Sequence, residues 1–131
     1  MDPVDHKLRN LGLAFIAHGM VIGAWVLFCI FGGLILLIVA LMDDAAALPM
    51  GGLALVYAAL AAINGFIALL HIMAGVQLRK GGGLMLTIAG LATTLICMIL
   101  ALYCSPASLG LLVYGIIVLA DGDVRARLDQ P

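Results

Sequence analysis

Three long runs without a charged residue dominate the sequence: Asn10–Met42, Ala45–Leu78 and Gly81–Ala120. A helix needs about 20 consecutive apolar residues to cross the hydrocarbon core of a bilayer, and each run is long enough. Of the 131 residues, 66% are hydrophobic and only 10% are charged. A soluble domain of this size cannot bury so much apolar surface. The sequence therefore predicts an integral membrane protein whose first partner is the lipid bilayer.

A proline divides the third run into two expected spans. Proline lacks a backbone donor and disfavours helix in the preceding residue, so the Ser105-Pro106 pair predicts a helix end near Cys104. We expect an all-α fold, a four-helix transmembrane bundle in residues 11–120, with short tails at 1–10 and 121–131. No fold is expected in the second tail. The predicted spans are Leu11–Met42, Pro49–Gln77, Leu84–Tyr103 and Ala107–Ala120.

The first predicted span is longer than a bilayer core requires. It would measure about 48 Å as a helix, against a core of about 30 Å. We expect it to tilt, to kink near Gly32-Gly33, or to project from the membrane. Asp2 or Asp5 is the expected cap of its start.

Lysine and arginine predict the orientation, because short basic segments remain in the cytoplasm. All six basic residues fall on one side of the predicted topology, and the opposite connections carry only Asp43 and Asp44 or no charge. Both termini are therefore expected to be cytoplasmic (N-in, C-in). The basic residues are Lys7 and Arg9 before the first span, Arg79 and Lys80 between the second and third, and Arg125 and Arg127 after the fourth.

Small residues recur at steps of three and four along the second and third spans. Such spacing keeps one helix face toward a partner, and small side chains there let two backbones approach closely in lipid. We expect these two faces to pack on each other, with Leu91 off the seam and facing lipid or a looser contact. The predicted packing residues are Ala58, Ala61, Gly65, Ala68 and Gly75 on the first arm, and Gly83, Thr87, Gly90, Thr94 and Cys97 on the second.

The first span carries a small-residue face of its own, formed by Gly12, Gly19 and Gly23. Because the second and third spans are expected to use each other, this face is left for the fourth helix or for another copy of the chain. A homo-oligomer is the expectation that follows from the second alternative.

The polar side chains predicted inside the membrane are His18, Asn64 and His71. The two histidines lie at similar distances from the cytoplasmic ends of two antiparallel spans, which predicts similar depth. One interpretation is that each histidine is neutral and hydrogen-bonds across a helix interface. The other is that His18 and His71 ligate haem b or a metal ion between the helices.

Catalytic patterns are nearly absent from the sequence. No carboxylate lies inside a predicted span, and Gly81-Gly82-Gly83 does not have the order of a phosphate-binding loop. Ser105 and Ser108 are expected to lack a histidine partner on their side of the membrane. No basic stripe points to nucleic acid. We therefore expect a protein that is not an enzyme.

The second half of the chain carries a family resemblance. Leu70–Lys80, Gly90 and Ser105–Leu119, with Pro106 and Tyr114 at a typical spacing, resemble a widespread group of small bacterial four-span membrane proteins of unknown function. The resemblance implies four spans and a bacterial cytoplasmic membrane, and it implies no activity.

Three functions remain open at this stage. The leading hypothesis is a small membrane subunit that associates with itself or with another membrane protein through its glycine and alanine seams. The second is a haem- or metal-binding protein that uses His18 and His71. The third is an oligomeric pore or carrier, with a pore lined by Thr87 and Thr94.

Overall fold

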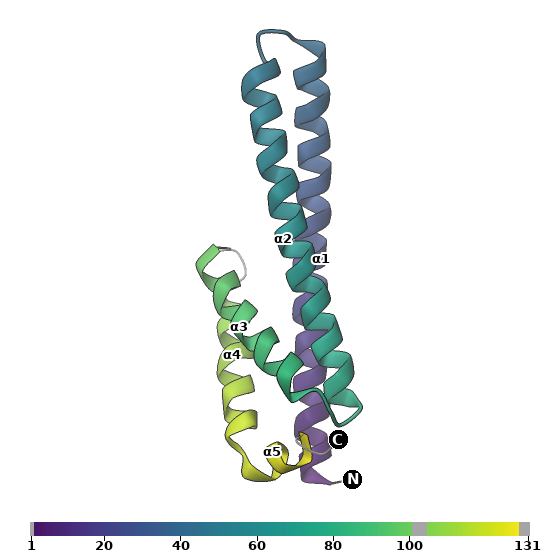
Figure 1. Ribbon diagram of the computed structural model, residues 1–131, viewed down its shortest axis with the longest axis vertical. Helices are drawn as coiled ribbons and strands as arrows, with labels where there is room; N and C mark the ends of the chain where they lie inside the picture. Colours follow the sequence, from purple (N-terminus) through teal and green to yellow (C-terminus); the bar gives the residue numbers. More distant parts are fainter. Residues whose placement is uncertain (1, 101–104, 129–131) are drawn as a thin grey trace. The chain divides into compact units, whose positions relative to one another are not determined.

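All regular structure in the described part of the chain is helical (Figure 1). The computed structural model describes residues 2–100 and 105–128. The expected all-α class is confirmed, whereas the helix end expected near Cys104 lies outside the described residues. The helices are α1 (Pro3–Met42), α2 (Ala47–Arg79), α3 (Leu84–Leu100), α4 (Ser105–Ala120) and α5 (Gly122–Leu128).

Two or three candidate membrane spans are found among the described residues, where four were expected. α1 and α2 are each long and apolar enough to cross a bilayer, and α4 with α5 forms a third candidate only if that pair, bent by 87°, is one span. α4 has 16 residues and is therefore about 25 Å long, which is less than a typical hydrocarbon core of about 30 Å. The described part of α3 has 17 residues.

The chain divides into two compact units. The bundle unit comprises Met1–Met20 and Ile67–Pro131, and so holds the start of α1, the end of α2 and all of α3, α4 and α5. The hairpin unit comprises Val21–Phe66, the remainder of α1 and α2.

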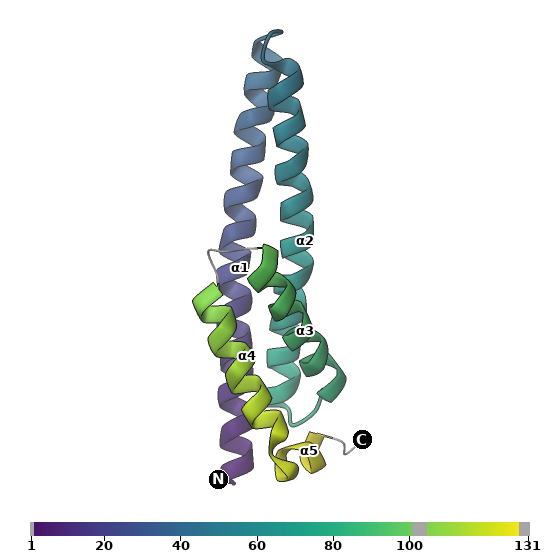
Figure 2. The ribbon, with the colours of Figure 1, turned by 90° about the vertical axis from the view of Figure 1, so that its left-hand side faces the viewer.

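Within the bundle unit, α3 and α4 run side by side (Figure 2), and every helix contributes to one apolar core. Asp2 caps α1, because its carboxylate accepts a hydrogen bond from the backbone N–H of Val4 at 3.1 Å. The sequence had predicted this cap at Asp2 or Asp5. The core residues are Leu8, Leu11, Phe15, Ala74, Leu78, Leu91, Leu111, Val118, Val124 and Leu128.

The C-terminal segment folds where no fold was expected. Val124 and Leu128 lie four residues apart on α5, so both face the core, where they are buried. Asp121 precedes α5 and accepts a hydrogen bond from the backbone N–H of Asp123 at 3.0 Å. It also forms an ion pair with Lys7 of α1. The hydrogen bond from Lys7 is the main cause that lowers the pKa of the Asp121 carboxyl.

In the bundle unit α1 and α2 approach to backbone contact. A Cβ atom added at Gly12 would lie 2.7 Å from the carbonyl oxygen of Gly75, and one added at Gly75 would lie 2.5 Å from that of Gly12. A Cβ at Gly19 would lie 3.0 Å from the carbonyl oxygen of Ala68. α2 therefore covers α1 at Gly12 and Gly19, so the expectation that these two glycines stay available for the fourth helix or another copy is wrong. At Gly23, the third glycine of that face, no described atom lies within 4 Å of an added Cβ.

The small face of α3 does point inward, but its partners differ from the expected ones. Thr87, Gly90, Thr94 and Cys97 are buried. A Cβ at Gly90 would meet Phe15 of α1 at 2.7 Å and Ala74 of α2 at 3.5 Å. Since Gly75 of α2 faces α1, the seams of α2 and α3 do not meet along their whole length. The spacing identified the faces but not how they pair.

Leu91 corrects a second expectation. Its side chain is only 7% exposed, and its Cδ2 atom lies 2.5 Å from the place where a Cβ at Gly115 of α4 would stand. Leu91 thus packs at the interface of α3 and α4, and it is part of the core instead of a lipid-facing residue. The short α4 offers α3 a glycine at the point where this leucine needs space.

The hairpin unit is two antiparallel helical segments joined by the turn at Asp43–Ala46, in which the Asp43 carboxylate accepts a hydrogen bond from Ala45 N–H at 2.9 Å. α1 continues as one helix through Gly32 and Gly33, where a kink was one expectation. A Cβ at either glycine would meet the ring or Cβ of Tyr57 at 3.0 to 3.2 Å. These glycines therefore make space for Tyr57 of α2.

Gly12→Ala should destabilise the protein by about 1–3 kcal/mol, because the new methyl group would collide with backbone atoms of α2 that cannot turn away. The matched control is Gly110→Ala, also in a helix of the bundle unit, where no described atom lies within 4 Å of the new Cβ. It should be neutral or stabilising by up to about 1 kcal/mol. Thermal unfolding in detergent, followed by circular dichroism, compares the two. Equal effects would contradict the close approach.

Candidate functional site

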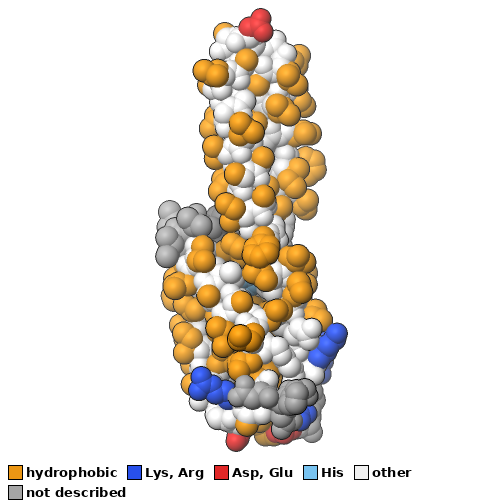
Figure 3. Space-filling view, viewed as in Figure 1, with side chains coloured by type: hydrophobic (Ala, Val, Ile, Leu, Met, Phe, Trp, Pro, Cys, Tyr) orange, Lys and Arg blue, Asp and Glu red, His pale blue; other side chains and the backbone are white. Residues whose placement is uncertain are grey.

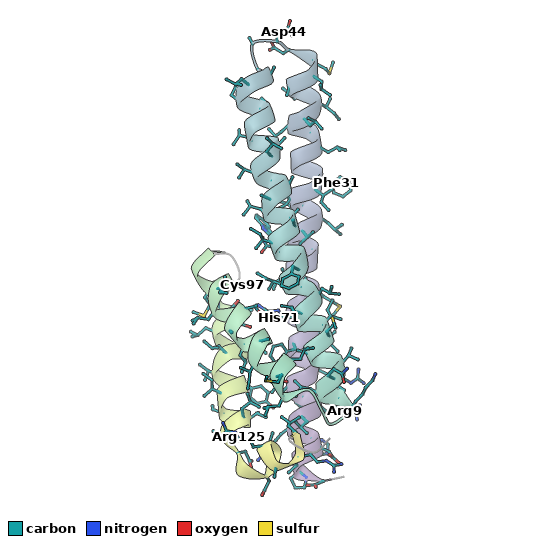
Figure 4. All side chains as sticks on the ribbon, in the orientation of Figure 1. Arg9, Phe31, Asp44, His71, Cys97 and Arg125 are labelled. Carbon is teal, nitrogen blue, oxygen red and sulfur yellow. The ribbon has the colours of Figure 1, made fainter. Side chains whose placement is uncertain are left out.

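The candidate site is a group of four buried polar residues in the bundle unit, one from each of α1, α2, α3 and α4. They are His18, His71, Thr94 and Ser108, called here the histidine cluster. His18 is 5% exposed and the other three are fully buried. Figure 4 shows His71 on α2 beside α3. Polar side chains at such depth in an apolar bundle require hydrogen-bond partners, so each contact is informative.

The helices position these residues through the same spacing that builds the core. On α1, His18 follows Leu11 and Phe15 and precedes Ile22, all of which are buried at steps of three and four. On α2, His71 lies between Ala68 and Ala74 in a stripe of the same kind. The two histidines therefore face inward from adjacent helices, and their ring centroids lie 5.1 Å apart with planes at 55°.

His71 contacts two hydrogen-bond partners. Its Nδ1 lies 2.8 Å from the carbonyl oxygen of Ile67, and its Nε2 lies 2.8 Å from Oγ1 of Thr94 on α3. The Thr94 hydroxyl also donates to the carbonyl oxygen of Gly90 at 2.7 Å. Phe15 covers the ring at a centroid distance of 5.5 Å. His71 of α2 thus hydrogen-bonds to α3 and packs against Phe15 of α1.

A neutral His71 fits these contacts. Its Nδ1 carries the hydrogen and donates to the carbonyl oxygen of Ile67, so the unprotonated Nε2 is an acceptor. The Thr94 hydroxyl has one hydrogen and two acceptors within reach, Nε2 of His71 at 2.8 Å and the carbonyl oxygen of Gly90 at 2.7 Å. Burial favours this neutral arrangement over a charged ring.

His18 is less well satisfied. Its Nε2 lies 3.3 Å from Oγ of Ser108 on α4, while its buried Nδ1 has no hydrogen-bond partner among the described residues. An unpaired buried polar atom costs about 1–3 kcal/mol. The expectation that Ser108 has no histidine partner is wrong. The sequence signal for an inward-facing Ser108 is the spacing of Ser108, Leu111, Gly115 and Val118 at steps of three and four. All four residues are buried.

The geometry around the two histidines does not fit a haem held between them. Both Nε2 atoms already face hydroxyl groups, and the backbones of α1 and α2 are in near contact at Gly12 with Gly75 and at Gly19 with Ala68. A flat macrocycle between His18 and His71 would require these helices to separate. Within the described part of the chain, no three residues of the types that bind metals come together.

The remaining polar residues predicted from the sequence donate to carbonyl oxygens four residues earlier in the chain. Asn64, in the hairpin unit, donates from Nδ2 to the carbonyl oxygen of Leu60 at 2.8 Å. Thr87 donates to that of Gly83 at 2.9 Å, and Gly83 lies in the turn before α3 with a φ of 90°. Thr87 and Thr94 are both fully buried inside the bundle unit. Their burial gives no support to a pore lined by these hydroxyls.

Comparison of the chain with protein-family models, with curated proteins and with solved structures finds no match. The resemblance to small four-span membrane proteins therefore stays a hypothesis.

Thr94→Val should destabilise the protein by about 1–2 kcal/mol, because it keeps the shape of the side chain and leaves Nε2 of His71 unpaired. The adjacent Thr93 is the control. Its hydroxyl also donates to the carbonyl oxygen of Gly90, at 2.9 Å, but the residue is half-buried. Thr93→Val should change the unfolding midpoint in detergent by much less. If the two variants unfold alike, the bond to His71 contributes nothing to stability.

Proposed function

We propose that this protein is a membrane subunit that associates with a second copy of itself through the hairpin unit. The observation that carries the proposal is the exposure of both helices of that unit. Apolar side chains are spread over its surface (Figure 3), and many large ones are exposed. Those with half or more of their surface exposed include Leu27, Phe28, Phe31, Leu34 and Ile35 on α1, and Leu55, Val56, Ile63 and Phe66 on α2.

Any membrane protein exposes apolar residues to lipid, so their exposure alone does not indicate self-association. The shape of the surface is the stronger argument. A groove of about 290 Å³ lies between the two helices of the hairpin unit. Its lining combines large aliphatic side chains with small residues from both helices. The lining residues are Cys29, Ile30, Gly33, Leu34, Leu37, Gly51, Ala54, Leu55 and Ala58.

Small residues on the groove favour another helix as its occupant. Gly51, which is half-buried, and Ala58, which is exposed, lie seven residues apart and so on one face of α2, a spacing of small residues that lets two helices approach closely in a bilayer. A second copy presents the same strip, so a two-fold contact would place the two strips against each other. The sequence prediction of a homo-oligomer was based on the glycine face of α1, but Gly12 and Gly19 contact α2 of the same chain. The proposal is therefore based on the groove of the hairpin unit instead.

The proposed topology places both termini in the cytoplasm of a bacterial cell. It is supported by the clustering of basic residues within the bundle unit. Arg9, Arg79, Lys80 and Arg127 line one pocket, and Lys7 pairs with Asp121. Basic residues from three separate segments thus share one end of this unit, as the retention of such segments in the cytoplasm requires.

Ala58→Leu should weaken self-association about fivefold in dissociation constant, because its side chain would occupy the groove. The control is Ala59→Leu, which adds the same side chain at the next residue, also exposed but outside the groove. Energy transfer between labelled copies in liposomes, recorded at several protein-to-lipid ratios, measures both. A wild-type chain that stays monomeric at every ratio would end the proposal.

Alkaline phosphatase fused after Asp44 should be active, whereas a fusion to the C-terminus should be inactive. The enzyme folds only outside the cytoplasm, and the turn at Asp43–Ala46 lacks the basic residues that would retain it. A fluorescent protein that folds in the cytoplasm should give the opposite pattern at the same two sites. An active phosphatase at the C-terminus would reverse the topology.

A further inference from the structure

We infer that the basic pocket of the bundle unit is a binding site for the phosphate group of an anionic phospholipid. The pocket has a volume of about 310 Å³ and is formed by residues of α1, α2, α5 and the turn after α2. Among the described residues, four basic side chains and one carboxylate line it. The lining residues are Asp5, Leu8, Arg9, Leu78, Arg79, Lys80, Gly81 and Arg127.

The packing of the helices gathers these charges. The close approach of α1 and α2 places the side chain of Arg79 across α1, where a Cβ at Gly12 would lie 2.9 Å from its Cγ atom. Arg127 is brought to the pocket by α5, which is held by the burial of Val124 and Leu128. Residues far apart in the sequence thus converge through contacts that belong to the core.

Charge and position together identify the ligand. Like charges gathered in one pocket repel one another, and an anion relieves that repulsion. Arg9 immediately precedes the uncharged run Asn10–Met42, and Arg79 immediately follows the uncharged run Ala45–Leu78. The pocket therefore lies where apolar helices meet water, which is the level of lipid phosphates.

The lining also favours a lipid over a free anion. Leu8 and Leu78 also line the pocket, and the helices that carry them expose large apolar side chains nearby in the chain, such as Leu13 on α1 and Val76 on α2, so charged side chains adjoin an apolar helix surface. A phospholipid matches both parts, because its phosphate meets the arginines and its acyl chains follow the apolar helices. This site lies in the bundle unit and does not depend on self-association through the hairpin unit.

The experiment measures lipid binding to the purified full chain in neutral detergent by native mass spectrometry. Phosphatidylglycerol is compared with phosphatidylcholine of the same acyl chains. Wild-type protein should prefer phosphatidylglycerol, and Arg79→Gln should weaken that binding about fivefold. The control is Arg125→Gln, which removes the same charge from an exposed residue of α5 outside the pocket. It should change the affinity less than about twofold.

A second variant is expected to bind phosphatidylglycerol more tightly than wild type, a result that misfolding cannot produce. Asp5→Asn removes the only carboxylate among the described residues that line the pocket, so it should strengthen phosphatidylglycerol binding several-fold. Equal losses for Arg79→Gln and Arg125→Gln would show a general surface attraction and overturn the site. Displacement of the lipid by millimolar inorganic phosphate at constant ionic strength would assign the pocket to a soluble anion and also overturn it. Ala58→Leu should bind phosphatidylglycerol like wild type, which separates this result from that of self-association.

Discussion

The backbone contact between α1 and α2 at Gly12 and Gly75 is the constraint on which the bundle unit depends. In lipid the hydrophobic effect does not bring helices together, so close packing and hydrogen bonds must do so. This contact turns the stripe of Leu11, Phe15 and His18 toward the other helices, where α3 accepts Phe15 at Gly90. The same approach directs Arg79 across α1. Core, polar cluster and basic pocket therefore share one geometric cause.

Steps of three and four residues made much of this unit predictable. They identify the inward face of α3 and the buried positions Ala61, Ala68 and Gly75 of α2, although Ala58 is exposed. For the two histidines the sequence predicted only a similar depth. Spacing identifies a face but not its partner, so the sequence could not show that Gly75 meets α1 or that Leu91 meets Gly115. The sequence also could not show α5. Only two of its residues, Val124 and Leu128, are buried in the core, and two residues are too few to form a recognisable pattern. The start of α5 depends on Asp121, which accepts a hydrogen bond from the backbone N–H of Asp123.

Burying the polar side chains of the histidine cluster in an apolar bundle costs free energy, but their hydrogen bonds make the packing of the helices more specific. Each of its four residues belongs to a different helix, so its hydrogen bonds favour one arrangement over others of similar apolar packing. The bonds are incomplete, since Nδ1 of His18 has no hydrogen-bond partner among the described residues, and the single hydroxyl hydrogen of Thr94 is shared between Nε2 of His71 and the carbonyl oxygen of Gly90.

The glycines of the hairpin unit give a further argument for association. A glycine in a helix costs about 1 kcal/mol relative to alanine, so its presence needs a reason. Gly32 and Gly33 are explained by Tyr57. At Gly23, Gly51 and Gly52, by contrast, no described atom lies within 4 Å of an added Cβ. Lipid chains are flexible and gain little from a flat helix surface, whereas a second helix gains a close approach. Gly51 lines the groove, so one of these unexplained glycines lies on the surface proposed to meet another copy.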